Sequence, residues 1–226
     1  MSSGPIDATA PAGRRERRKR EIHDRILEAA VSLFEEKGFA ATTAVEIAAV
    51  ADVAEKTFYN HFASKQTLTQ ELAEESLARL REMLEQARAC PGSIAERLEH
   101  FFRRAAQDAE HGSRGLTREL ILELVRASHI EGIGPERNRH LHGCFADLLR
   151  DGVEQGELDP ALDVEFFTEL CVASYTGIIM NWVSVSDYPL QSRLLAAARF
   201  LGDAIRAVPP IAATVRPTPI PQEARE

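Results

Sequence analysis

Apolar residues recur at every third or fourth position along most of the chain, the spacing that places them on one face of an α-helix. Residues 19–37 show this spacing clearly, and Gly38 follows them as a typical helix stop. No stretch alternates between apolar and polar residues as a strand does, so we expect no β-strand. The pattern predicts an all-α chain with about nine helices. Six of them are expected at residues 65–90, 93–110, 116–130, 136–153, 164–185 and 189–208.

Two short helical patterns follow the first long one. Thr43 stands three residues before Glu46, which is the signature of a capping box at a helix start. The first pattern ends at Asp52, and the second runs from about Ala54 to Phe62. A short helix, a tight turn and a second helix with a polar outer face form a helix-turn-helix, whose second helix enters the DNA major groove. We assign Val45, Ile47, Phe58 and Phe62 to the core.

Composition divides the chain into four segments. Residues 1–18 are expected to be a disordered basic arm, because small residues and prolines lead into the basic run RRERRKR. That run is either a solvated extension of the first helix or an arm that reaches phosphates or the minor groove. Residues 19–65 form the expected helix-turn-helix domain and residues 66–208 a helical domain. Residues 209–226 contain five prolines and are expected to form a flexible tail.

The charge is distributed unevenly along the chain. The whole chain has a net charge of -8. Residues 14–65 hold 10 Lys and Arg against 9 Asp and Glu, a net of +1, whereas residues 66–226 hold 17 against 25, a net of -8. The acidic excess therefore lies away from the expected DNA-binding domain. Within that domain, the same negative charge would repel phosphate.

Cysteine usage and hydropathy bear on the compartment. Cys90, Cys144 and Cys171 are an odd number at wide spacing, which does not suggest a disulfide framework. The N-terminal segment has no apolar core like that of a secretory signal. The longest apolar run, residues 170–185, is too short and too polar for a membrane span, which needs about 20 apolar residues. We expect a cytoplasmic protein.

Residues 25–68 resemble the DNA-binding domain of the TetR/AcrR family of one-component regulators. Downstream, the resemblance is limited to the helix count, the turn GELDP and the apolar penultimate helix. The matching residues in the N-terminal domain are Arg25, Ile26, Leu27, Ala29, Ala30, Leu33, Phe34, Gly38, Phe39, Thr42, Thr43, Ile47, Ala48, Ala51, Val53, Thr57, Tyr59, His61, Phe62, Lys65 and Leu68.

Two residues depart from the family pattern. Asp52 stands where the turn often has Gly, and Asp is one of the few other residues that accept a left-handed backbone. Ala54 stands where the recognition helix often begins with Ser or Thr, so no side-chain cap is expected there. Glu55 then places a negative charge in the first turn of that helix, where it suits the helix dipole but repels phosphate.

The resemblance implies which side chains meet DNA. Hydroxyl, imidazole and ammonium groups donate hydrogen bonds to phosphate oxygens. Lys56 suits guanine and Asn60 suits adenine, while Glu55 can accept from cytosine. For Tyr59 and His61 the alternative is packing at the helix end. The implied phosphate contacts are Thr43, Thr57, Tyr59, His61 and Lys65, and the implied base-facing residues are Glu55, Lys56 and Asn60.

The resemblance also implies a small-molecule pocket and a homodimer. Helices 164–185 and 189–208 would form the dimer interface, because residues 164–185 are apolar on all sides and need cover on two. Aromatic residues at helical spacing are also expected in a plain core. The pocket candidates are Phe101, Phe102, His129, Phe145, Tyr175, Asn181 and Trp182.

Neither a metal site nor a catalytic site is expected. His140, His142 and Cys144 could share a metal, but four ligands at a known spacing are absent, so no cofactor is predicted. No G-x-S-x-G, P-loop or G-x-G-x-x-G is present, so we do not expect an enzyme. The hypothesis is a repressor that binds a palindromic DNA operator as a dimer and is released by a small apolar ligand. The alternatives are a ligand-blind or activating regulator, and a helical small-molecule enzyme or carrier.

Overall fold

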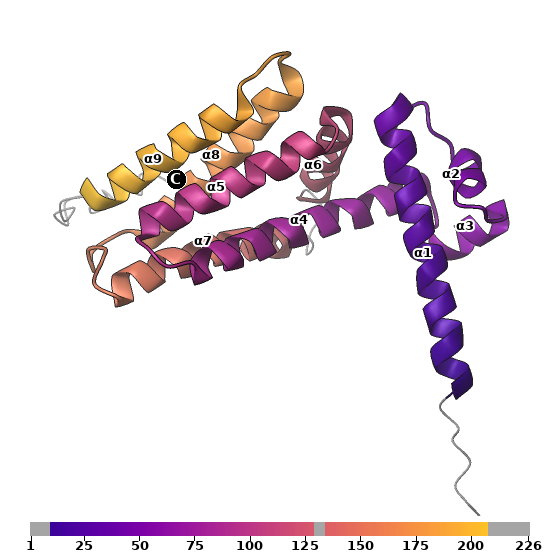
Figure 1. Cartoon of the computed structure of the whole chain (residues 1–226), viewed down its shortest axis with the longest axis horizontal. Coiled ribbons are helices and arrows are strands. Elements are labelled where there is room, and N and C mark those ends of the chain that lie inside the picture. The colour runs from indigo at the N-terminus through magenta and orange to yellow at the C-terminus, as the bar shows by residue number, and fades with distance from the viewer. Residues whose placement is uncertain (1–9, 129–133, 208–226) are drawn as a thin grey trace, which may run out of the picture.

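The computed structural model describes residues 10–128 and 134–207, which form α-helices joined by turns and loops (Figure 1). The prediction of an all-α fold with about nine helices is confirmed. The helices of the described part are α1 (Ala10–Lys37), α2 (Ala44–Val50), α3 (Glu55–His61), α4 (Lys65–Ala89), α5 (Ile94–His111), α6 (Arg114–Ser128), α7 (Gly134–Glu154), α8 (Val164–Ser184) and α9 (Leu190–Ala207).

Local capping explains where three of these helices begin. Thr43 and Glu46 form a reciprocal capping box at the start of α2, and Ser93 and Glu96 form another at the start of α5. The Ser64 hydroxyl accepts a hydrogen bond from the backbone N–H of Thr67 at the start of α4. These are starts that the sequence pattern predicts.

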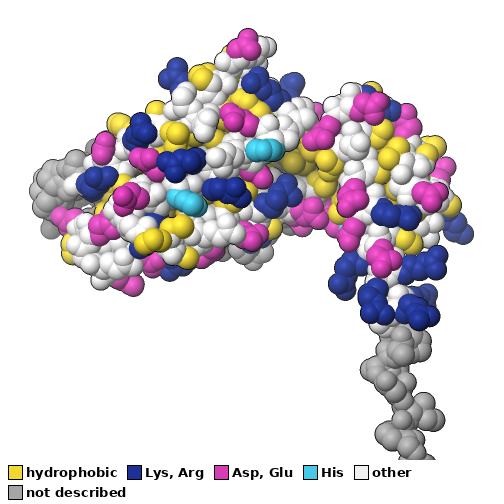
Figure 2. Space-filling model, in the orientation of Figure 1, with side chains coloured by type: hydrophobic (Ala, Val, Ile, Leu, Met, Phe, Trp, Pro, Cys, Tyr) yellow, Lys and Arg dark blue, Asp and Glu magenta, His cyan; other side chains and the backbone are white. Residues whose placement is uncertain are grey.

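The first helix begins earlier than we expected. The predicted disordered arm extends to residue 18, but α1 already begins at Ala10. The basic run is therefore a helical extension, and residues 13–20 are exposed. Figure 2 shows Lys and Arg side chains gathered at this end of α1. Arg and Lys are good helix formers, so a charged exposed helix needs no apolar stripe of its own here.

Two hydrophobic clusters hold the chain together. We call α1–α3 with the first turns of α4 the head; its core includes Ile26, Phe34, Phe58, Phe62 and Leu68. We call the rest of α4 together with α5–α9 the body. The first helix, α1, crosses α4 at the end that lies away from the body (Figure 1). Because α4 supplies Leu68, Leu72 and Ala73 to one core and Met83, Leu84 and Ala87 to the other, it links the two.

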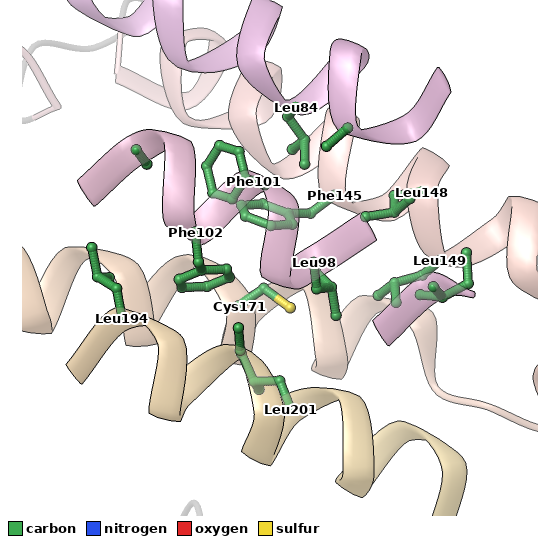
Figure 3. Packing of buried hydrophobic residues seen from close by; sticks show 14 of the residues in the cluster. Leu84, Leu98, Phe101, Phe102, Phe145, Leu148, Leu149, Cys171, Leu194 and Leu201 are labelled. Carbon is green, nitrogen blue, oxygen red and sulfur yellow. The ribbon is translucent and has the colours of Figure 1, made fainter. Parts of the chain in front are cut away.

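In the body, α5 is covered by other helices on several sides. Its Leu98, Phe101 and Phe102 point into a core that Phe145 of α7 and Leu194 and Leu201 of α9 complete (Figure 3). On α8, Phe167, Cys171, Ile179 and Trp182 are buried, while Phe166 and Met180 stay exposed. No helix in residues 10–128 or 134–207 is long and apolar enough to cross a membrane.

Candidate DNA-binding surface and ligand cavity

The recognition helix α3 is short and held by one buried ring. Phe58 is fully buried in the head, and α3 begins after Ala54, which makes no side-chain cap. The turn before it contains Asp52 with φ of 52°, a left-handed backbone. Arg25 of α1 donates a hydrogen bond to the Asp52 carbonyl at 3.2 Å. The left-handed turn at Asp52 and the uncapped start of α3 at Ala54 therefore agree with the expectations from the sequence. The hydrogen bond from Arg25 of α1 supports the turn.

The outer face of α3 is polar and open. Glu55, Lys56 and Asn60 are exposed, and Tyr59 is half exposed. The assignment of Val45 to the core is wrong, because its side chain is 54% exposed. Val45 lies two residues before the buried Ile47, which is about 200° around a helix, so the two cannot share one face. Val45 therefore lies on the accessible side of the helix-turn-helix.

The implied phosphate-contacting residues lie in different surroundings. The Thr43 hydroxyl donates to Glu46 Oε2 at 2.8 Å within the capping box. Thr57 is half-buried in α3, and Tyr59 lies outward. His61 ends α3 with its ring 5.7 Å from that of His23, and partial burial, followed by His23 and Lys19, lowers the pKa of His61.

Lys65 is engaged inside the head. Its Nζ donates hydrogen bonds to the carbonyl oxygens of Phe39 at 2.5 Å and Thr42 at 2.6 Å. The same atom lies 4.0 Å from the centroid of the Phe39 ring. Partial burial lowers the pKa of Lys65, while the charges of Glu119 and Glu46 raise it. Sequence patterns gave no sign of these contacts.

A cavity of about 290 Å³ lies in the body among α4, α6, α7 and α8. Apolar side chains dominate its wall, with Leu80 from α4, Leu120 and Ile121 from α6 and Val172 from α8. The polar groups include His142 and Tyr175. An apolar cavity with a few polar groups is typical of a small-molecule site.

One pocket candidate, Tyr175, lines this cavity. Its ring centroid lies 5.9 Å from that of Phe101, and burial, followed by the charge of Asp108, raises the pKa of its hydroxyl. The other candidates do not line it. Phe101, Phe102, Phe145 and Trp182 are buried core residues, Asn181 is exposed, and His129 lies outside the described residues.

The residues that line the cavity and were missed carry only a weak sequence signal. The spacing H-x-H-x-C indicates His142 only as a possible metal ligand, and it gives no sign that His142 lines a cavity. Cys144 is half-buried and burial raises its pKa, while the His140 side chain lies outside the described residues. Within the part of the chain that the structure describes, no three His, Cys, Asp or Glu side chains gather as metal ligands would.

A second cavity of about 410 Å³, the junction cleft, lies where the head meets the body. Its walls include Val31 of α1, Leu72 of α4 and Asp108 of α5. Figure 2 shows hydrophobic side chains in the notch between the two parts. The cleft and the body cavity share Ser76, Leu80, Thr117, Leu120, Tyr175 and Ile179 in their walls, so the body cavity adjoins the head.

Comparison with known proteins agrees with this arrangement. The family of bacterial regulatory proteins of the TetR type matches residues 26–72, which cover α2, α3 and the flanking parts of α1 and α4. The HTH-type transcriptional repressor KstR2 of Mycobacterium tuberculosis is 28% identical over 166 residues, which are 70% of this chain and 78% of that repressor. Residues 26–72 are a TetR-type DNA-binding domain. Like its TetR-family relatives, the chain is a DNA-binding transcriptional regulator.

Solved TetR-family structures extend the likeness to the body. Thermus thermophilus FadR, a repressor in complex with lauroyl-CoA, is 27% identical, with a TM-score of 0.57 over 89% of this chain and 100% of that one. Bacillus subtilis FadR in complex with stearoyl-CoA is 22% identical, with a TM-score of 0.62 over 82% of this chain and 98% of that one. The second likeness concerns the fold alone.

Proposed function

We propose that the protein is a homodimeric repressor that binds a palindromic operator and is released when a small apolar ligand fills the body cavity. The observation that supports this most is the position of α6. Its Leu120 lines the body cavity and is also buried in the head core. A ligand that presses on α6 therefore acts on a helix that the DNA-binding head already contacts. Because its target is DNA, the protein would work in the cytoplasm. It would regulate transcription and would not act as an enzyme.

The ligand class follows from the cavity wall and from one relative. The wall is mostly apolar, so it favours a ligand with a long apolar part. Lauroyl-CoA, which the FadR relative from Thermus thermophilus binds, has such a part. Tyr175 and His142 would orient the polar end of the ligand.

The DNA contacts are proposed from the exposed face of α3. Two recognition helices would enter successive major grooves about 34 Å apart. Lys56 and Asn60 would face bases with Glu55, while Thr43, Thr57, Tyr59 and His61 would meet phosphates. Lys65 is already held by the carbonyls of Phe39 and Thr42, which leaves its ammonium less free to meet a phosphate.

Selection of duplexes from a random pool, followed by mobility shift, tests this function. We expect enrichment of a palindrome and a salt-sensitive shift with dimer stoichiometry. Asn60→Ala should relax the preference at one base pair of each half-site, whereas Tyr59→Phe should weaken binding to all sequences alike. A library of apolar acids, alcohols and acyl thioesters is then screened for release. Failure to enrich any palindrome would contradict the proposal, and enrichment without release by any compound would favour the ligand-blind regulator.

A further inference from the structure

Lys65, the first residue of α4, braces the corner between α1 and α2. Its two acceptors, the carbonyls of Phe39 and Thr42, lie in the connection just before the α2 cap at Thr43. The Thr42 hydroxyl donates to the Gly38 carbonyl at 2.9 Å and reinforces the same corner. Two of the three N–H groups of the Lys65 ammonium are thus used within the head.

The surroundings of Lys65 are internal as well. The side chain is half-buried against the Phe39 ring, a cation–π arrangement that gains strength from partial desolvation. The charges of Glu119 on α6 and Glu46 on α2 also act on the ammonium. An ammonium held in this way keeps one N–H for a further acceptor, and it must break internal hydrogen bonds before it can extend outward toward a phosphate.

The next residue, Gln66, connects α4 to the wall of the body cavity. Its Nε2 donates to Oε2 of Glu123 on α6, and Glu123 is only 1% exposed. A buried carboxylate is costly unless it is hydrogen-bonded, so this contact constrains how α4 and α6 lie. One turn earlier on α6, Leu120 lines both the body cavity and the junction cleft.

We propose that Lys65 and Gln66 act together at the start of α4. Lys65 positions the α1–α2 corner instead of neutralising a phosphate. Gln66 couples that corner to α6 through its hydrogen bond with Glu123. The second half rests on the proposed ligand response. A displacement of α6 by material in the cavity then moves Glu123, the first turn of α4 and the α1–α2 corner together. The recognition helix follows, because α3 packs on that corner through the head core.

The salt dependence of operator binding tests the role of Lys65. Loss of a phosphate contact lowers the slope of log affinity against log salt by about 1. We expect Lys65→Met to weaken binding at least tenfold with the slope unchanged. Lys65→Arg should restore most of the affinity, because a guanidinium can donate to both carbonyls. A slope that falls by about 1 in Lys65→Met and recovers in Lys65→Arg would overturn the assignment.

Thermal melting gives a second readout if the Lys65→Met protein is too unstable for binding experiments. Removal of a side chain that only meets DNA leaves the melting temperature of the free protein unchanged. A large loss of melting temperature in Lys65→Met, reversed in Lys65→Arg, therefore supports the internal role. Unchanged melting together with a lower salt slope contradicts it.

A double-mutant cycle tests Gln66 without knowledge of the ligand. Val172→Phe adds bulk to the body cavity from α8, so we expect it to weaken operator binding as a ligand would. In a Gln66→Met background the same change should have at least a fivefold smaller effect, since the link to Glu123 is cut. Glu123→Gln keeps an acceptor for Gln66 and should retain most of the effect.

Gln70→Met is the matched control, because it makes the same chemical change one turn further along α4. It should leave the effect of Val172→Phe intact. Additive effects of Val172→Phe and Gln66→Met, or no effect of Val172→Phe on operator binding, would overturn the coupling while leaving DNA binding established. If the unaltered protein selects no duplex, the proposed function itself fails, and the melting comparison still decides the role of Lys65.

Discussion

At the scale of single residues, Glu46 fastens α2 to α1. Its carboxylate accepts from the Thr43 backbone N–H at 2.8 Å and pairs with Lys37, the last residue of α1. The hydrogen bond from Lys37, followed by those from Thr43, lowers the pKa of Glu46 from 4.5 to about 2. The folded protein therefore holds this carboxylate in its charged form more strongly than the unfolded chain does.

This shift predicts how an acid series of melting curves should behave. A lowered folded-state pKa gives stability that is fully present above pH 4.5 and is lost as the pH falls toward 2. We expect Glu46→Gln to melt below the unaltered protein at pH 6, with the difference shrinking between pH 4.5 and pH 2. Circular dichroism melts at half-unit intervals measure it. A difference that stays constant down to pH 2 would contradict the assignment of the shift to Glu46.

Individual residues were predictable where a local rule governs them. The Thr43–Glu46 box needs only a spacing of three, and the positive φ of Asp52 follows from the turn. The contacts of Lys65 join residues 23 and 26 positions apart, and no local pattern encodes them. The pocket candidates illustrate the same limit, because an aromatic residue in a core and one at a cavity wall share the same helical spacing.

At the scale of elements, α5 and α9 approach closely because a glycine lies between them. A Cβ placed on Gly202 would lie 2.7 Å from the Cβ and 3.2 Å from the Cα of Ala95. The second of these atoms is backbone and cannot rotate away. Gly202→Ala should therefore force the two helices apart and destabilise the protein by about 1–3 kcal/mol, as overpacking does.

Chemical denaturation measures this cost against a control in the same body. A Cβ on Gly143 of α7 would meet nothing within 4 Å, so Gly143→Ala should stabilise the protein by about 0.5–1 kcal/mol through helix propensity alone. Equal effects of the two substitutions would show that propensity, and not the α5–α9 contact, decides the result at Gly202.

The elements themselves were largely predictable, since caps and glycine stops lie near most of their ends. The start of α1 was not, because the basic run has neither a cap nor an apolar stripe. Long-range packing was also beyond the pattern. Periodicity places Leu120 on the inner face of α6. Its contact with the head core and its position in the walls of both cavities depend on how three helices meet.

At the scale of the whole molecule, large apolar side chains stay uncovered on α8 and the helix that follows it. Phe200 of α9 is 71% exposed, and Phe166 and Met180 of α8 are also exposed. A contiguous exposed apolar patch marks an interaction surface, and we propose that these side chains contribute to one. A second copy of the chain, related by a two-fold axis, would bury the same residues on both sides, which is the interface we propose for the dimer.

A charge at Phe200 tests that interface and its link to DNA binding. Phe200→Glu would bury two carboxylates near each other in a symmetric interface, so we expect a monomer in sedimentation experiments. The monomer has one recognition helix and should lose about 10²–10⁴-fold in operator affinity, because the second half-site no longer adds to binding. Gln191→Glu places the same charge on the opposite side of α9, where it should leave the dimer intact. A Phe200→Glu protein that remains dimeric would move the interface elsewhere, whereas a monomer with full operator affinity would contradict the two-headed mode of binding.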